Sequence, residues 1–226
     1  MKNYNRTAVL KRLRPWASLL LPVIFMGALV LFFSVSRSLQ AQTAGGTQTL
    51  IFIRHAEKPA AGLGQLNCQG LNRAIALSTV LPRDYGNANF VFASNPNRHV
   101  KEGVNDESFS YLRPLLTISP SAIKLGLAIN IDFSANDTSD LADELMHDKY
   151  HAATVYTAWS HGYLPELINR VATEASGKDQ VIISDWDSSD YDSLYVLTLV
   201  WHDGKATVSH KVVKQGLNNG SLSCPV

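Results

Sequence analysis

From Gln48 to the end of the chain, short apolar runs alternate with longer segments whose apolar residues recur at helical spacing. This alternation is typical of an α/β domain, in which helices pack on a sheet. No internal repeat or low-complexity tract interrupts it, so we expect one domain over residues 48–226. The expected strands are the apolar runs Thr49–Ile53, Phe90–Ala93, Ile129–Ile131, Thr154–Ala158 and Val181–Ser184.

Four segments have the apolar spacing of helices. They are Gly70–Leu81, Leu112–Leu125, Ser139–Lys149 and a segment that starts at Leu164 and ends before Gly177. The inward residues of the first are predicted to be Leu71, Ala74, Ile75 and Leu81, and Asn67 is its capping candidate. Because Pro120 lies inside the second segment, we expect that helix to be kinked or split there.

The C-terminal part has the signature of a β-hairpin. The apolar runs SLYVLTLVW and ATVSHKVV flank the tetrapeptide HDGK. Its Asp203-Gly204 pair favours a type I′ turn, because both residues tolerate the positive φ angles that this turn needs. We therefore expect a mixed sheet, parallel in its centre and antiparallel at one edge.

The N-terminal segment predicts export or membrane anchoring. Five basic residues precede an uncharged stretch whose inner part, Ala17–Val35, is almost wholly apolar and long enough to cross a bilayer. Ala41 follows at a position where a signal peptidase could cut, and residues 42–47 resemble a polar, Gly-rich linker. We expect residues 1–41 to be a signal peptide or an anchor, with the domain on the outer side of the cytoplasmic membrane in either case. The sequence is compatible with two outcomes. Either the segment is cleaved and the domain is periplasmic, or the segment is retained and anchors the domain to the outer face of that membrane.

The charge distribution argues against nucleic acid as a partner. Residues 1–41 contain six basic residues and no acidic one, which leaves 14 basic and 19 acidic residues from Gln42 onward. Such a domain lacks the excess of Lys and Arg that binding to a phosphate backbone requires. The sequence has no HExxH motif, no Cys-rich ligand spacing and no P-loop motif, so we expect neither a metal nor a cofactor.

Two predicted strands end in histidines. The run TLIFI is followed directly by Arg54-His55-Ala56-Glu57-Lys58-Pro59, and the run TVYTA leads into Trp159-Ser160-His161-Gly162. Ligands of open α/β sheets bind at the carboxyl ends of the strands, so both histidines are expected at one sheet edge. Taken alone, each motif has another interpretation. Arg54 and His55 could form a solvated rim at the end of a strand, and His161 could be a histidine of the core.

Five ordered blocks carry a resemblance. They are the strand with RHAEKP, then LNCQGLNRAIAL (66–77), FASNP (92–96), YLRPLLTISPSA (111–122) and VYTAWSHG (155–162). In order and spacing they resemble the histidine phosphatase, or phosphoglycerate mutase-like, superfamily. The resemblance covers about residues 48–213 and implies a three-layer α/β/α sandwich and catalysis through a phosphohistidine.

The resemblance also implies roles for individual residues. His55 would be the nucleophile, Arg54 and Arg113 would clamp the phosphate, and His161 would be the second histidine of the pocket. The chemistry suits these types, because guanidinium groups stabilise the charge on the equatorial oxygens of a transferring phosphoryl group. A neutral imidazole is a competent nucleophile near pH 7.

The sequence departs from the superfamily pattern at the general acid. In one branch an acidic residue follows the second histidine, where this chain has Gly162. Glu57 is the leading candidate for the acid, and the other candidates are Asp132, Asp137, Asp106 and Glu107. Arg98 is a rival to Arg113 for the second clamp, because it follows Ser94 at the spacing often seen in the second motif.

The function that these features predict is an exported phosphatase that hydrolyses the phosphate monoester of a small molecule or of a phosphorylated protein. The alternative is a phosphatase-like domain that binds an anionic ligand in the cell envelope without turnover. Cys68 and Cys224 are the only cysteines. Both lie in the part expected to be translocated, where an oxidising compartment favours a disulfide between them.

Overall fold

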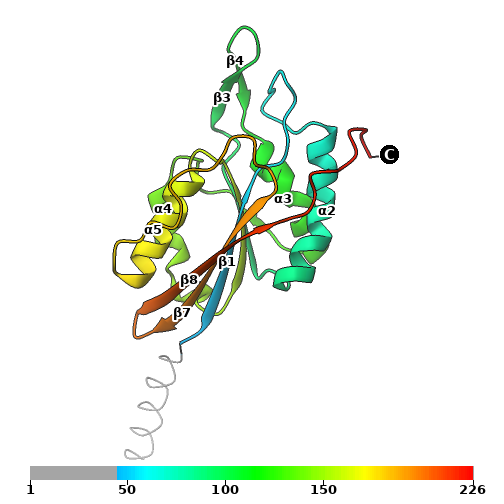
Figure 1. Cartoon of the computed structure of the whole chain (residues 1–226). Helices are drawn as coiled ribbons and strands as arrows, with labels where there is room; N and C mark the ends of the chain where they lie inside the picture. Colours follow the sequence, from blue (N-terminus) through cyan, green and yellow to red (C-terminus); the bar gives the residue numbers. More distant parts are fainter. Residues whose placement is uncertain (1–44, 226) are drawn as a thin grey trace, which may run out of the picture. The chain divides into compact units, whose positions relative to one another are not determined.

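The computed structural model describes residues 45–225 (Figure 1). The predicted signal or anchor segment at residues 1–41, and the start of the linker, lie outside the described residues. Within 45–225, no helix has both the length and the apolar character needed to cross a membrane.

The described residues form an α/β fold with a six-stranded sheet, a separate two-stranded hairpin and four α-helices. The strands are β1 (Thr47–Arg54), β2 (Phe90–Ala93), β3 (His99–Glu102), β4 (Glu107–Ser110), β5 (Ile129–Asn130), β6 (Thr154–Trp159), β7 (Ser193–His202) and β8 (Lys205–Lys214). The helices are α2 (Cys68–Tyr85), α3 (Arg113–Leu125), α4 (Thr138–Leu145) and α5 (Leu164–Ser176), with a short 3-10 turn at Asp148–Tyr150.

The sheet has the order β5-β2-β6-β1-β7-β8. The first four strands of this order pair in parallel, and β7 and β8 add antiparallel pairs at the other side. The predicted mixed sheet is therefore confirmed. The hairpin between β7 and β8 is also confirmed, with Asp203 at φ 48° and Gly204 at φ 77°, the positive angles of a type I′ turn.

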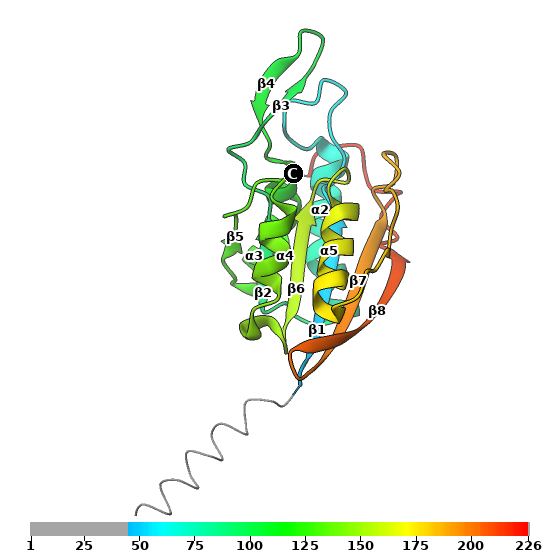
Figure 2. The same cartoon turned by 90° about the vertical axis from the view of Figure 1, so that its left-hand side faces the viewer.

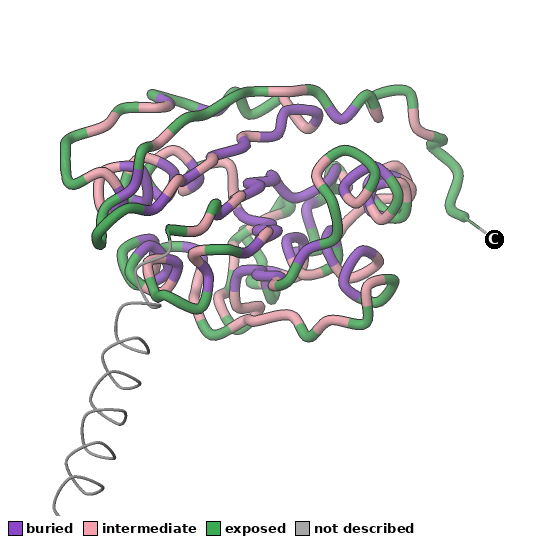
Figure 3. The backbone as a smooth tube through the Cα atoms, turned by 90° about the horizontal axis from the view of Figure 1, so that it is seen from below, coloured by how far each residue is buried: buried purple, intermediate pink, exposed green. Residues whose placement is uncertain are grey.

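Helices cover both faces of the sheet. Figure 1 shows α4 and α5 on one side and α2 and α3 on the other. The central strand β1 supplies both cores because its side chains alternate: Leu50 and Phe52 pack with the α4 and α5 layer, and Ile51 and Ile53 pack with the α2 and α3 layer. Buried segments accordingly run through the interior, with exposed segments along the outside (Figure 3).

Helix α2 begins at its predicted cap but faces the core differently from the prediction. Asn67 accepts a hydrogen bond from the backbone N–H of Gly70, as a capping residue does. Leu71 and Ile75, which were predicted to face inward, are 37% and 45% exposed. The buried face instead includes Arg73, a residue type whose burial an apolar pattern does not indicate.

Helix α3 is continuous through Pro120, so of the two expected outcomes, a kink or a split, the split is wrong. Proline removes the hydrogen bond that its own N–H would make to the carbonyl of Leu116, and its ring crowds that carbonyl. The turns on either side are held by burial of Ile118 and Ala122 against the sheet. That packing outweighs the cost of the proline.

The predicted strand at Val181–Ser184 is absent from the structure. The backbone groups of this segment are bound by a side chain of α5 instead of a neighbouring strand. The amide oxygen of Asn169 accepts from the N–H groups of Ile182 and Ile183, and its NH₂ group donates to the carbonyl of Ile183.

The hairpin of β3 and β4 lies in a segment that the sequence indicated as a polar loop. Its strands alternate only between half-buried and exposed side chains, so they lack the apolar alternation that identifies a strand. Figures 1 and 2 both show it projecting beyond the carboxyl end of β1, beside the loop that follows that strand. The backbone N–H of Gly64 in this loop donates to Glu102 of β3 at 3.0 Å.

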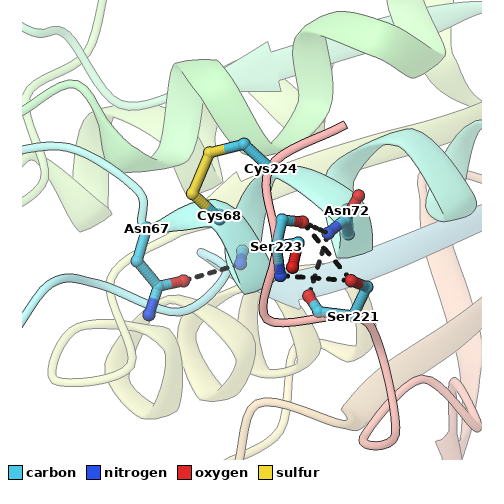
Figure 4. The surroundings of a disulfide bond; sticks show 7 residues. Asn67, Cys68, Asn72, Ser221, Ser223 and Cys224 are labelled. Carbon is cyan, nitrogen blue, oxygen red and sulfur yellow. Dashed lines mark hydrogen bonds between the residues drawn. A yellow bond between two sulfur atoms is a disulfide. The ribbon is translucent and has the colours of Figure 1, made fainter. Parts of the chain in front are cut away.

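The predicted disulfide between Cys68 and Cys224 is present, and their Cα atoms are 4.4 Å apart (Figure 4). It fastens the C-terminal tail to the first residue of α2. Asn72, one turn further along α2, donates to the carbonyls of Ser221 and Ser223 at 2.9 and 2.7 Å. The tail is therefore held by a covalent bond and two hydrogen bonds, although it has little apolar surface.

We predict that replacing both cysteines with serine lowers the free energy of unfolding by ~5 kcal/mol, because the bond closes a loop of 156 residues in the unfolded chain. Urea unfolding of the oxidised protein and of the variant measures this difference. Mass spectrometry after alkylation of the unfolded, unreduced protein is the control, and two adducts at that stage would show free thiols and contradict the bond.

Candidate active site

The parallel pairing of β1 and β6 brings the two histidine motifs together. Arg54 lies opposite Trp159 in the register, and the N–H of His55 donates to the carbonyl of Trp159 at 2.9 Å. The rings of His55 and His161 consequently have centroids 6.3 Å apart. The expectation that two strands deliver their histidines to one sheet edge is confirmed.

Both histidines line a cavity of about 420 Å³ at this edge. The basic side chains that line it are Arg54, Lys58, Arg98, Lys101 and Arg113. Glu102 is its one acidic lining residue within the described part of the chain. The cavity is thus strongly positive, which suits an anionic ligand.

His55 has the geometry and protonation of a nucleophile. Its Nδ1 lies 2.8 Å from the carbonyl oxygen of Ala56, an acceptor, which fixes the hydrogen on Nδ1 and leaves the Nε2 lone pair free. Burial lowers the pKa of His55 well below 6.5, and the charges of Arg113 and Arg54 lower it further, against a smaller raising effect of the Ala56 carbonyl. His55 is therefore neutral at pH 7.

Arg54 is held by neutral groups. It is 2% exposed, and its Nη1 donates to the backbone carbonyls of Asp187 and Asp190 at 3.3 and 3.1 Å. Its guanidinium carbon lies 3.7 Å from the centre of the Tyr191 ring. These contacts fix the side chain while leaving its charge uncompensated by any ion pair within residues 45–225.

Arg113 is held partly by the β3–β4 hairpin. Its Nη1 donates to Glu102 at 2.7 Å, and its guanidinium stacks on Tyr111 at 4.7 Å. Burial acts to raise the pKa of Glu102, but hydrogen bonds from Arg113, Gly64 and Lys58 overcome that effect and lower the pKa to about 2. Glu102 is therefore ionised and orients Arg113.

Three nitrogens around His55 lack hydrogen-bond partners within the described residues. They are Nε of Arg54, Nε of Arg113 and Nδ1 of His161, and all three are buried. A buried polar group without a partner costs about 1–3 kcal/mol, and a charged one costs more. Two guanidinium donors and an imidazole nitrogen around one histidine are a suitable set for the oxygens of a phosphoryl group.

Glu57, the leading candidate for the general acid, does not line the cavity. Both of its carboxylate oxygens accept from Arg73, at distances between 2.6 and 3.0 Å. Arg73 also donates to Asp192, Gln215 and Asn218. Through Arg73, Glu57 therefore connects the loop after β1 to the C-terminal segment, and both of its oxygens are engaged there.

The other acid candidates also lie outside the cavity lining. Asp132 binds Asn130, and Asp137 accepts from the N–H of Ser134 just before α4. Asp106 and Glu107 are exposed at the turn of the hairpin and the start of β4. The carboxylate that does line the cavity, Glu102, belongs to the hairpin that the apolar pattern did not reveal.

The structure places both arginine candidates at the cavity, in different settings. Arg113 is buried and has one unpartnered donor close to the histidines. Arg98 is half-buried, and it donates to the side chains of Asn136 and Tyr163. Of the two arginines, Arg113 is therefore the one that is buried with an unpartnered donor. No group of His, Cys, Asp and Glu side chains in residues 45–225 is arranged to hold a metal ion.

No protein-family model and no curated protein matches the sequence. A mycobacterial glucosyl-3-phosphoglycerate phosphatase aligns over 74% of this chain and 98% of its own, at 14% identity and a TM-score of 0.48. A phosphoserine phosphatase from Entamoeba histolytica aligns over 75% of this chain and 98% of its own, at 13% identity and a TM-score of 0.45. These neighbours belong to the histidine phosphatase superfamily.

We predict that free His55 remains in the neutral, Nδ1-protonated form at pH 6, where an exposed histidine is mostly charged. Its lowered pKa also means that the folded state binds fewer protons than the unfolded state just below pH 6.5, so His55 lowers stability as the pH falls through that range. Long-range ¹H–¹⁵N NMR of the imidazole, assigned with His55→Gln, measures both tautomer and titration. A midpoint at or above pH 6.5 would show that the site does not depress the pKa.

We also predict that Glu57→Gln lowers the free energy of unfolding by about 1–3 kcal/mol, because the new amide NH₂ group faces the donors of buried Arg73. Chemical unfolding measures the loss. Glu166→Gln is the matched control, since Glu166 pairs with Arg170 at the exposed surface of α5 and should contribute under about 0.5 kcal/mol. Equal stabilities for the two variants would contradict a structural role of Glu57.

Proposed function

We propose that this chain is a phosphatase of the histidine phosphatase superfamily that hydrolyses phosphate monoesters through a phosphohistidine on His55. The observation that carries the proposal is the set of three unpartnered nitrogens around a buried, neutral histidine. The five sequence blocks support the same assignment.

In the first step, Nε2 of His55 attacks phosphorus, the N–P bond forms, and the ester P–O bond breaks. The leaving oxygen departs with the bonding electrons as an anion and takes up a proton from solvent water. Arg54 and Arg113 direct their free Nε donors at the phosphoryl oxygens, where charge is spread in the transition state. The contact between Nδ1–H of His55 and the carbonyl of Ala56 stabilises the positive charge that develops on the ring.

In the second step, water attacks the phosphohistidine, the N–P bond breaks, and inorganic phosphate leaves. The imidazole returns to its neutral form, which the surrounding cations favour. His161 would donate a hydrogen bond from its unpartnered Nδ1 to a phosphoryl oxygen. Burial lowers the pKa of His161, as do Arg54 and the other nearby cations.

The protonation state of the carboxyl group that lines the cavity determines which leaving groups can depart readily. Glu102 is the carboxyl that lines the cavity in the described chain, and its pKa of about 2 leaves it without a proton to donate at pH 7. We therefore propose that turnover is fastest with leaving groups that depart readily as anions, such as phenolates. Glu57 is not suited to be the general acid, because Arg73 engages both of its carboxylate oxygens.

The same observation favours a second candidate function. A cavity that binds phosphate but has no protonated carboxyl could serve an anion-binding domain of the cell envelope without turnover. In either case the expected ligand is a phosphorylated small molecule or a phosphorylated protein side chain.

We also propose that the domain is exported. The basic flank and the apolar stretch Ala17–Val35 support this, as does a disulfide that an oxidising compartment would preserve. The N-terminal sequence of the mature protein from the cell envelope distinguishes a cleaved signal peptide from an anchor.

We predict that His55→Ala reduces phosphate release from phenyl phosphate at least about a thousandfold, equivalent to about 4 kcal/mol in the barrier. Steady-state phosphate release, measured between pH 4 and 8, gives the comparison. His210→Ala, a change on the exposed side of β8, is the control and should retain wild-type rates.

Two outcomes contradict parts of this proposal. Wild-type kcat in His55→Ala would exclude the phosphohistidine mechanism. A wild-type protein that binds inorganic phosphate but releases none from any ester would favour the anion-binding function instead.

A further inference from the structure

We propose that the cavity contains a second anionic subsite at Arg98, so that the preferred substrates are small phosphate monoesters that carry another anionic group. A carboxylate or a second phosphate would meet this requirement. The inference rests on the proposed phosphatase function, since it takes the phosphoryl site at His55 as given.

The charge of the cavity exceeds what one phosphoryl group needs. Five cationic side chains line it against the single carboxylate of Glu102, which gives a net of four positive charges when the histidines are neutral. A phosphate monoester dianion compensates two of these. The remaining two favour a ligand with further negative charge.

Arg98 is fixed in place without being neutralised. It donates to the amide oxygen of Asn136 and to the hydroxyl of Tyr163 at 2.8 Å, and its guanidinium lies 4.9 Å from the centre of the Tyr163 ring. All of these partners are uncharged. By contrast, Lys58 and Arg113 share Glu102, so their charges are partly compensated within the protein.

Such an arginine is suited to recognising a carboxylate or a phosphate. Its planar fork can bind two oxygens at once, and its partners already restrict its rotamers, which reduces the entropy lost on binding. A role in tying the hairpin to Tyr163 alone would explain the hydrogen bonds. It would leave unexplained why all partners are neutral in a cavity that already has a cationic excess.

The size of the cavity also exceeds that of a bare phosphoryl group. Its volume of about 420 Å³ lies in the range of small-molecule sites. Residues 98–102 line the same cavity as Arg54, His55 and His161, and Arg98 lies directly before β3. A small substrate with two anionic ends can therefore contact both sets of residues.

The test uses three aryl phosphates that differ only in the second group: phenyl phosphate, 3-carboxyphenyl phosphate and benzene-1,3-diyl bisphosphate. Values of kcat/KM are measured for the wild type, Arg98→Gln and Arg98→Lys. Each variant is compared with the wild type on the same substrate, so differences in leaving group cancel. Arg83→Gln is the control, because Arg83 is exposed near the end of α2 and pairs with Asp84.

We expect Arg98→Gln to lose at least tenfold more kcat/KM on one or both doubly anionic substrates than on phenyl phosphate, with partial recovery in Arg98→Lys. The arm that shows the larger loss identifies carboxylate or phosphate as the group recognised. Equal losses on all three substrates, with an unchanged unfolding midpoint, would overturn the subsite.

Failure of the proposed function is distinguishable from failure of the subsite. If the wild-type protein hydrolyses none of the three compounds, calorimetric affinities of the same compounds for the wild type and Arg98→Gln decide the question. Tighter binding of the doubly anionic compounds that depends on Arg98 would support the subsite, and equal affinities would overturn it.

Discussion

The parallel pairing of β1 with β6 is the constraint on which the candidate site depends. It sets Arg54 opposite Trp159, and this register determines how close the next residues of each strand lie. A shift of one residue would move His55 to the other face of the sheet, because side chains alternate along a strand. The buried apolar residues of β1, which pack in both cores, resist such a shift. The relative positions of the site residues thus depend on the packing of β1 in the two cores.

Electrostatics then gives these positions their chemistry. Several cationic side chains line the cavity together with His55. Burial and the charges of Arg113 and Arg54 keep His55 neutral. The cations are positioned by carbonyls, tyrosine rings and one carboxylate, so most of their charge stays available to a ligand. The same charges that would bind a phosphoryl group therefore also keep His55 unprotonated.

Much of this arrangement could be predicted from the sequence, for identifiable physical reasons. Helix α5 was predictable because Leu164, Leu167 and Ile168 continue in a strict helical period on one buried face. The β7–β8 hairpin was predictable because its turn needs residues that accept positive φ angles. The histidines were expected at one edge because the carboxyl ends of parallel strands coincide.

What the sequence did not reveal depends on contacts between distant residues. The burial of Arg73 is possible only because Glu57 and Asp192 compensate its charge, and no local pattern indicates that pairing. For the same reason Glu57 seemed available for catalysis. Glu102 was missed because its hairpin contains almost no buried apolar side chain. Local periodicity identifies elements that bury apolar faces. It does not identify elements that are held in place by ion pairs and polar hydrogen bonds.

The contacts between the N-terminal and the C-terminal part of the domain affect the stage at which the protein can fold. The central strand β1 needs β7 as a neighbour, Arg73 needs partners at residues 192, 215 and 218, and Cys68 needs Cys224. These contacts are separated by more than a hundred residues, so little of the N-terminal half can be completed before the last strands have been synthesised. The contacts of β1 with β7, of Arg73 with its partners and of Cys68 with Cys224 can form only after those last residues have been synthesised. If the chain is exported in the unfolded state, as proposed above, slow formation of these distant contacts would help to keep it unfolded during transfer.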